Sequence, residues 1–135
     1  MIEVADGGMH PDWIRSLMED FTKSNAEMDV SFNSKGSESV IAVKDGAPAG
    51  IMMFDTDPSF KINMIHAYSG CDDVIEPMVK SIIAMANLQG KNCVIVHAMD
   101  RDGTMRGLFI NMGFKNSANC PCCLREGTIH MKLSF

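Results

Sequence analysis

The chain has 135 residues, of which 46% are hydrophobic and 21% are charged, and its formal net charge at pH 7 is −5. This length and composition predict one globular domain over residues 1–135 and argue against disorder. The negative charge gives no reason to expect a nucleic acid or an anionic membrane as a partner. No apolar run approaches the ~20 residues that span a bilayer, and the first residues lack a signal-peptide pattern. The chain has five cysteines, an odd number that cannot all pair in internal disulfides. The missing membrane and signal patterns and the odd cysteine count together favour a reducing, cytoplasmic location.

A short strand and a helix are expected at the start of the chain. Met1–Ala5 suits a strand, and Asp6–Gly8 suits a turn. A helix is predicted over Pro11–Ser24, because apolar residues recur there at helical spacing and proline suits the first turn. Those apolar residues are Trp13, Leu17, Met18 and Phe21. The polar stretch over residues 25–39 predicts a loop.

Three consecutive antiparallel strands are expected next. Val40–Val43 and Ala49–Phe54 flank Asp45-Gly46, a dipeptide that strongly favours a tight hairpin turn. After a second turn, Lys61–Tyr68 alternates apolar and polar residues enough to form the third strand.

A helix, a buried strand and a final hairpin are predicted for the second half. Asp73–Gln89 carries apolar residues at helical spacing, and Gly90 suits its end. Asn92–Met99 is a nearly continuous apolar run of the kind that is buried on both faces, and it should run parallel to the strand before the helix. In the last strand, Thr128–Phe135, every second residue is apolar, which places Ile129, Met131, Leu133 and Phe135 on one side.

The stretch Arg106–Phe114 predicts a short helix that stops at Gly113, in a left-handed backbone that only glycine adopts cheaply. This arrangement resembles the C-terminal part of the GNAT acetyltransferase superfamily, whose members often show Asn-x-x-Ala-x-x-x-Tyr-x-x-x-Gly-Phe there. Asp102, Met105 and Phe109 stand in the three diagnostic places of this chain, so phenylalanine replaces the tyrosine. The element order is similar to that of the superfamily over nearly the whole chain. The resemblance implies an α/β (α+β) fold with a mixed central sheet flanked by helices.

The resemblance also implies acetyl-CoA as the acyl donor, with its pyrophosphate at the N-terminus of the long helix. The loop there typically reads Arg/Gln-x-x-Gly-x-Gly/Ala, because bare backbone N–H groups must approach the phosphates closely. Ala86 and Gly90 match the usual end of this helix, and counting back places Gly70, Asp73 and Ile75 at the three motif positions. All three depart from the motif.

The departures from the motif disfavour the binding of a phosphate at this loop. Asp73 and Glu76 form the pattern of a capping box, so their side chains could occupy the N–H donors that a phosphate would use. With Asp72, they place three carboxylates at the positive end of the helix dipole, which opposes a polyanion. The sequence therefore predicts either an ordinarily capped helix or weak acetyl-CoA binding.

The candidate cofactor-binding residues implied by the resemblance come from three segments. In the superfamily a backbone N–H of the fourth strand polarises the thioester carbonyl, the loop before the long helix receives the pyrophosphate, and the tyrosine of the C-terminal motif commonly acts as the acid that protonates the departing thiolate. In this chain these are Ile65 and Ala67; Gly70, Cys71, Asp73, Val74 and Ile75; and Asp102 and Phe109.

Catalysis of this type needs no metal and no covalent intermediate, because a general base deprotonates an amine that attacks the thioester directly. The base candidates are His66, late in the fourth strand, and His97, late in the fifth. Those strands splay apart at this end in the superfamily, so both residues could reach the thioester. Alternatively, each is an ordinary half-exposed histidine at a strand end. Tyr68 is the only tyrosine, and its position makes it a poor substitute for the missing acid.

Three cysteines, Cys120, Cys122 and Cys123, lie together before the last strand. Their spacing lets two sulfurs converge on zinc, but a full site needs a further donor such as Cys71 or His130. They could also form a redox pair, grip a substrate or be inert. We expect reduced thiols without stoichiometric zinc.

The leading hypothesis is an acyl-CoA-dependent N-acyltransferase, most simply an acetyltransferase, acting on an amine of a small molecule or peptide. One alternative is a catalytically degenerate GNAT-like domain that binds a ligand or partner. Another is a cysteine-centred metal or redox-sensing module. A homodimer is one possible assembly.

Overall fold

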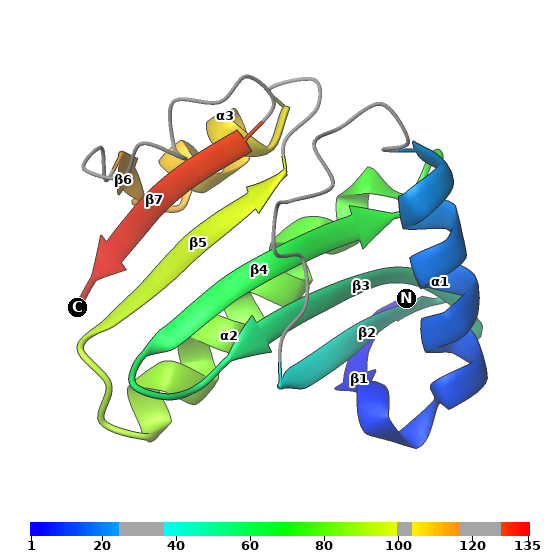
Figure 1. The fold of residues 1–135 in the computed structure, drawn as a ribbon, viewed down its shortest axis with the longest axis horizontal. Coiled ribbons are helices and arrows are strands. Elements are labelled where there is room, and N and C mark those ends of the chain that lie inside the picture. Colours follow the sequence, from blue (N-terminus) through cyan, green and yellow to red (C-terminus); the bar gives the residue numbers. More distant parts are fainter. Residues whose placement is uncertain (25–36, 100–103, 117–127) are drawn as a thin grey trace.

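The computed structural model describes residues 1–24, 37–99, 104–116 and 128–135. All of its strands form one mixed sheet in the order β1-β2-β3-β4-β5-β7-β6 (Figure 1). The strands are β1 (Ile2–Asp6), β2 (Glu38–Lys44), β3 (Ala47–Asp55), β4 (Phe60–Ala67), β5 (Cys93–Met99), β6 (Lys115–Asn116) and β7 (Thr128–Ser134).

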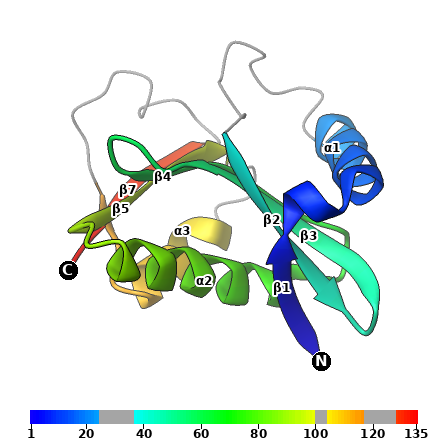
Figure 2. The ribbon, with the colours of Figure 1, turned by 90° about the horizontal axis from the view of Figure 1, so that it is seen from below.

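Helices cover both faces of this sheet. The helices are α1 (Pro11–Ser24), α2 (Ile75–Leu88) and α3 (Thr104–Asn111), with 3-10 turns at Gly7–Met9 and Asp72–Val74. Figure 2 shows α1 on one face and α2 and α3 on the other. The expected mixed sheet flanked by helices is thus confirmed. Within the described ranges, no helix combines the length and the apolar character needed to cross a bilayer.

The expected elements form with small differences at their ends. The turn between β2 and β3 has positive φ at both Asp45 (53°) and Gly46 (84°), as a tight hairpin requires. The loop expected to reach Ser39 ends earlier, because Glu38 and Ser39 pair with β3. The turn expected over Asp6–Gly8 is partly a 3-10 helix, and the Asp6 carboxylate accepts a hydrogen bond from the N–H of Gly8.

The C-terminal hairpin also departs in one detail from the sequence pattern. Ile129 and Met131 are buried as expected, and Leu133 packs against the same core. Phe135 lies beyond the strand and is half exposed, so the strand expected over Thr128–Phe135 ends one residue earlier, at Ser134. The alternation ends where the strand ends.

The central feature of the sheet is the parallel pair β4 and β5, whose expected orientation is confirmed. The two strands pair only from Phe60 to Ile62 on β4 and from Val94 to Val96 on β5. Beyond these residues they diverge toward their C-terminal ends (Figure 1). A gap between the two strands therefore opens at the end of the sheet where α1 and the start of α2 also lie.

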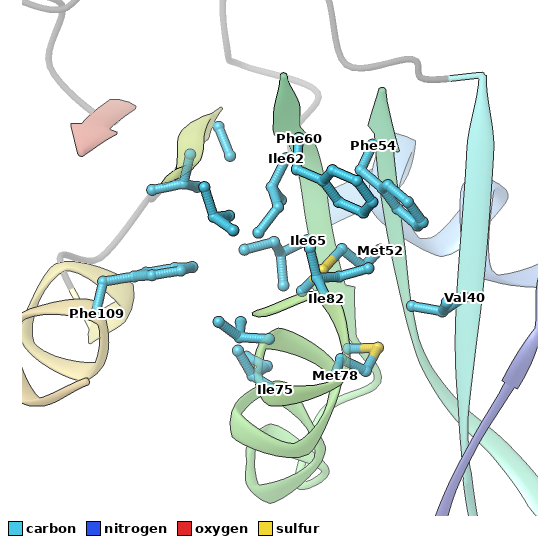
Figure 3. Packing of buried hydrophobic residues seen from close by; sticks show 14 of the residues in the cluster. Val40, Met52, Phe54, Phe60, Ile62, Ile65, Ile75, Met78, Ile82 and Phe109 are labelled. Atoms are coloured by element: carbon cyan, nitrogen blue, oxygen red, sulfur yellow. The ribbon is translucent and has the colours of Figure 1, made fainter. Parts of the chain in front are cut away.

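Two hydrophobic clusters hold the layers together. The larger one joins the sheet to α2 and α3, and Figure 3 shows its side chains converging from β2, β3, β4, α2 and α3. The smaller one lies under α1 and contains Leu17, Phe21, Ile41, Ile51 and Met64. Burial of this apolar surface is the main contribution to the stability of such a fold.

Gly50 allows β3 to run close to the start of α2. A Cβ at this position would lie 2.8 Å from Cγ2 of Val74 and 3.0 Å from the carbonyl oxygen of His66. Any side chain here would push these elements apart. The glycine thus fixes how closely the end of β4 and the loop before α2 pack against β3.

Candidate active site

His66 and His97 lie on the same face of the sheet, on the two sides of the gap between β4 and β5. On β5, the residues Val94, Val96 and Ala98 pack into the α2 and α3 cluster, so His97, between them in the alternation, points to the opposite face. His66 contacts residues of α1, which covers that opposite face. The structure therefore brings the two base candidates to one side of the sheet.

His66 forms a pair with Asp20 of α1. Its Nε2 lies 2.6 Å from Oδ2 of Asp20, the residue is only 9% exposed, and the Phe21 ring packs edge-on against the imidazole. Because an ionised carboxylate only accepts hydrogen bonds, a neutral His66 donates from Nε2 and keeps its lone pair on Nδ1. Asp20 thus fixes both the orientation and the tautomer of a potential base.

Tyr68 follows His66 by two residues and lies against the same helix. Burial and the negative charge of Asp20 raise the pKa of Tyr68, although a hydrogen bond with Ser16 opposes the shift. A raised pKa makes the phenol a weaker acid near neutral pH. Tyr68 therefore packs beside His66 as a polar side chain and is a poor candidate for the acid that donates a proton.

His97 is stacked on His130 of β7. The two residues are cross-strand partners, with ring centroids 4.8 Å apart and an interplanar angle of 22°. Burial, His130 and the positive charge of Lys61 lower the pKa of His97. Burial and Lys61 also lower the pKa of His130. Both imidazoles thus stay neutral to a lower pH than an ordinary histidine.

This pair should make stability depend on pH. Because both pKa values are lower in the folded protein than the ordinary 6.5, the unfolded chain binds protons that the folded chain does not as the pH falls below 6.5. Each group thus contributes stability that is fully present above about pH 6.5 and is lost as the pH falls toward the folded pKa. We expect His97→Asn/His130→Asn to flatten the fall in Tm between about pH 7 and 5. Parallel melting curves for the variant and the wild type would contradict this.

The loop before α2 differs from the expected capping box. Neither Cys71, which precedes the 3-10 turn, nor Val74, which precedes α2, makes a side-chain cap hydrogen bond. The Asp73 carboxylate accepts a hydrogen bond of 2.8 Å from Nζ of Lys44, and Glu76 pairs with Lys80 at 3.1 Å. The expected capping box was wrong, because the two carboxylates pair with lysine side chains and not with backbone N–H groups.

The remaining loop residues fall into two groups. Gly70 has φ +82° with open space around it, and Cys71 is a partly buried free thiol. Val74 and Ile75 are buried in the larger core cluster, so only their backbone could meet a ligand. The loop thus offers backbone N–H groups, but Asp72 and Asp73 still add negative charge next to them.

Asp73→Asn is expected to improve acetyl-CoA binding about fivefold, since removing one unit charge near a polyanion is worth roughly 1 kcal/mol. The substitution removes a negative charge and also releases the Lys44 ammonium, whose pKa is raised by the hydrogen bond that it donates to Asp73. The gain should shrink with added salt. Stability should change little, because the ion pair is exposed.

Titration calorimetry on the wild type, Asp73→Asn and Asp12→Asn measures this effect. Asp12 lies in the first turn of α1 and is the matched charge control. Tighter binding by Asp12→Asn alone, or weaker binding by Asp73→Asn, would contradict the electrostatic argument.

The predicted residues on β4 border the gap. Ile65 pairs with Met52 and Ala67 pairs with Gly50, so β3 occupies one edge of β4. Along its other edge, β4 has no strand partner beyond Ile62 in the described pairing with β5. The backbone groups along this edge are therefore not used in the described pairing with β5.

Phe109 lies in the hydrophobic core. It is fully buried, packs edge-to-face against Phe114 with ring centroids 4.8 Å apart, and points from α3 toward the residues of α2 and β4 (Figure 3). Its place as a cofactor-binding residue stays a prediction. Asp102 and the cysteines Cys120, Cys122 and Cys123 lie outside the described residues, as do the hypotheses that rest on them. Elsewhere in the described chain, no group of three or more potential ligands could hold a metal ion.

Two functional candidates were not anticipated. Asp20 orients His66, and Lys44 neutralises Asp73, each from a distant part of the chain. A signal for Asp20 does exist, because it adjoins Phe21 and follows Leu17 by three residues on the buried side of α1. A carboxylate at the border of an apolar face needs a partner there.

By sequence, the chain matches neither a protein-family model nor a curated protein. By structure, it is similar to a protein from Desulfovibrio desulfuricans that is described as an acetyltransferase of the GNAT family, with a TM-score of 0.69, 14% identity and 99% of each chain covered. This chain has the GNAT fold. Two further structures share this GNAT fold. An acetyltransferase from Bacillus subtilis in complex with CoA has a TM-score of 0.66, 12% identity, and 100% of this chain and 99% of that one covered. The aminoglycoside 6'-N-acetyltransferase from Enterococcus faecium has a TM-score of 0.69, 10% identity, and 98% and 96% covered.

Proposed function

We propose that this protein is an acyl-CoA-dependent N-acyltransferase that acts on an amine of a small molecule or peptide. The observation that carries the proposal is the Asp20–His66 pair beside the gap between β4 and β5. The gap has an unpaired strand edge on β4 and two histidines on one face of the sheet. Similarity in fold to acetyltransferases, one of them with CoA bound, supports this assignment.

Each residue beside the gap has a separate role in the proposed reaction. Acetyl-CoA, when bound, supplies an acyl group activated as a thioester. His66 accepts a proton from the attacking amine at Nδ1, and Asp20 stabilises the imidazolium that results. The free edge of β4 near Ile65 and Ala67 donates a backbone hydrogen bond to the acyl carbonyl oxygen. His97, kept neutral by its lowered pKa, lines the other side and helps to position the amine.

The lack of a tyrosine at Phe109 does not preclude turnover. A thiol has a pKa near 8.5, so a thiolate is a tolerable leaving group near neutral pH without a dedicated acid. The chain therefore depends more on its base than on an acid.

An assay for CoA thiol release tests the proposal. Wild-type protein is incubated with acetyl-CoA and each member of a panel of primary amines and peptides, and mass spectrometry identifies the acylated product. We expect amine-dependent thiol release and one acetyl group on the amine. Binding of acetyl-CoA without release for any amine in the panel would contradict turnover.

The second candidate is a degenerate GNAT-like domain that binds a ligand without turnover. It is favoured by the full burial of Phe109 and by the carboxylates of Asp72 and Asp73 in the loop before α2. This candidate predicts that His66→Gln leaves the affinity for acetyl-CoA unchanged and that neither form releases thiol.

A further inference from the structure

A small hollow lies between β6 and β7, on the same face of the sheet as His97 and His130. Its volume is about 260 Å³, and its lining consists of Gly113, Lys115, Asn116, Lys132 and Ser134. Along β7, Met131 and Leu133 pack into the core with α2 and α3. Lys132 and Ser134 alternate with them and therefore point to the opposite face.

Gly113 contributes only backbone to the wall of the hollow. Lys115 and Lys132 are partners in the antiparallel pair of β6 and β7. Two residues before Lys115 is Gly113, and two residues after Lys132 is Ser134, so the glycine lies opposite the serine. Gly113 has φ +98°, a backbone that favours glycine, and a Cβ there would lie 3.3 Å from Cδ1 of Leu133. A side chain at Gly113 would thus crowd Leu133 on the core side, so the glycine lets the chain pass close to β7.

Every polar side chain that lines the hollow can donate hydrogen bonds. Lys115 and Lys132 contribute ammonium groups, and Ser134 a hydroxyl. Asn116 is the cross-strand partner of the core residue Met131, and its Oδ1 accepts a hydrogen bond of 2.9 Å from Nη1 of Arg106 on α3, so its side chain lies on the other face and only its backbone borders the hollow.

The two lysines are directly opposite each other in the β6–β7 register. Like charges at such a position are unfavourable unless an anion lies between them. No acidic residue occurs in β5, β6 or β7, although the chain as a whole carries a net charge of −5. The positive charge is thus local, and it is matched to an oxyanion.

We propose that this hollow is a subsite for an oxyanion, a carboxylate or a phosphate, carried by the acyl acceptor. The assignment of the oxyanion to the acyl acceptor rests on the proposed acyltransferase function. The row that contains Lys115 and Lys132 lies two residues along β7 from His130, or about 7 Å. Adding the spacing between strands, the hollow lies on the order of 10 Å from His97. Because His66, the proposed base, lies farther from the hollow than His97 does, the acceptor is an amine with an acidic group at the far end of a long, extended chain.

The first test measures binding of inorganic phosphate by amide NMR, at constant ionic strength with chloride as the balancing anion. We compare the wild type with Lys115→Gln/Lys132→Gln and with the control Lys23→Gln/Lys80→Gln, which removes the same charge from α1 and α2. We expect saturable shifts at Gly113–Asn116 and at Ser134, about tenfold weaker binding in the first variant and no change in the control. Equal binding by both variants, or shifts that do not saturate, would overturn the subsite.

The second test compares ω-amino acids of increasing chain length with the matching n-alkylamines as acceptors. We expect the wild type to prefer the amino acid about tenfold in kcat/KM, and Lys115→Gln/Lys132→Gln to abolish this preference through KM with kcat unchanged. Equal use of both amines by the wild type overturns the assignment to the acceptor. Saturable phosphate binding without turnover of either amine keeps the subsite and contradicts the proposed function instead.

Discussion

His66→Gln is expected to lower kcat for amine acetylation about 10²–10⁴-fold, the usual contribution of a positioned general base. Glutamine keeps most of the volume and polarity of the side chain but cannot accept a proton near neutral pH. The affinity for acetyl-CoA should change little, because the base acts on the amine. Steady-state kinetics with saturating acetyl-CoA measures the effect.

Asp20→Asn tests the same pair from the other side. The asparagine amide can donate a hydrogen bond to Nε2 of His66, which favours the tautomer with its proton on Nδ1 and so removes the lone pair from that atom. We expect a loss of activity comparable in direction to that of His66→Gln. His10→Gln is the control, since His10 stacks on Trp13 at the start of α1, away from the gap. Full activity in His66→Gln would show that another group is the base.

Phe109→Ala is expected to lower the free energy of unfolding by about 3–5 kcal/mol. The side chain is fully buried and packs against Phe114 in the core between the sheet and α3, so its removal leaves a cavity lined by rigid neighbours. Such a loss is a large share of the 5–15 kcal/mol typical of a small domain. Chemical denaturation of the wild type and the variant measures the difference.

Ile110→Ala is the matched control on the same helix. Ile110 is 52% exposed, so its truncation should change stability by less than about 1 kcal/mol. Similar losses for the two variants would indicate that α3 is stabilised by its own helix propensity and not by the contact of Phe109 with the core.

Local signals predicted most of the fold. The Asp45-Gly46 turn, the helix end at Gly113 and the alternation along β7 each depend on residues that are close in sequence. The backbone has the positive φ values that the first two signals require, at Asp45, Gly46 and Gly113. The parallel pairing of β4 and β5 followed from the helix between them, because a long crossover favours parallel strands.

The site depended on contacts between distant residues, which local patterns do not contain. Asp20 and His66 are 46 residues apart, and Lys44 and Asp73 are 29 apart. The capping pattern at Asp73 was a valid local preference, but a lysine delivered by the end of β2 competed successfully for the same carboxylate. His66 and His97 were candidates from their positions at strand ends; their shared face followed only from the packing of α1.

The central claim is that an acyl-CoA molecule occupies the gap between β4 and β5. Titration of ¹⁵N-labelled protein with acetyl-CoA, followed by amide NMR, tests it most directly. The account predicts saturable shifts at Ile65–Tyr68 on β4 and at Gly70–Val74 in the loop before α2, with β1 unaffected. Shifts that avoid these two segments, or no shifts at millimolar acetyl-CoA, would contradict the account.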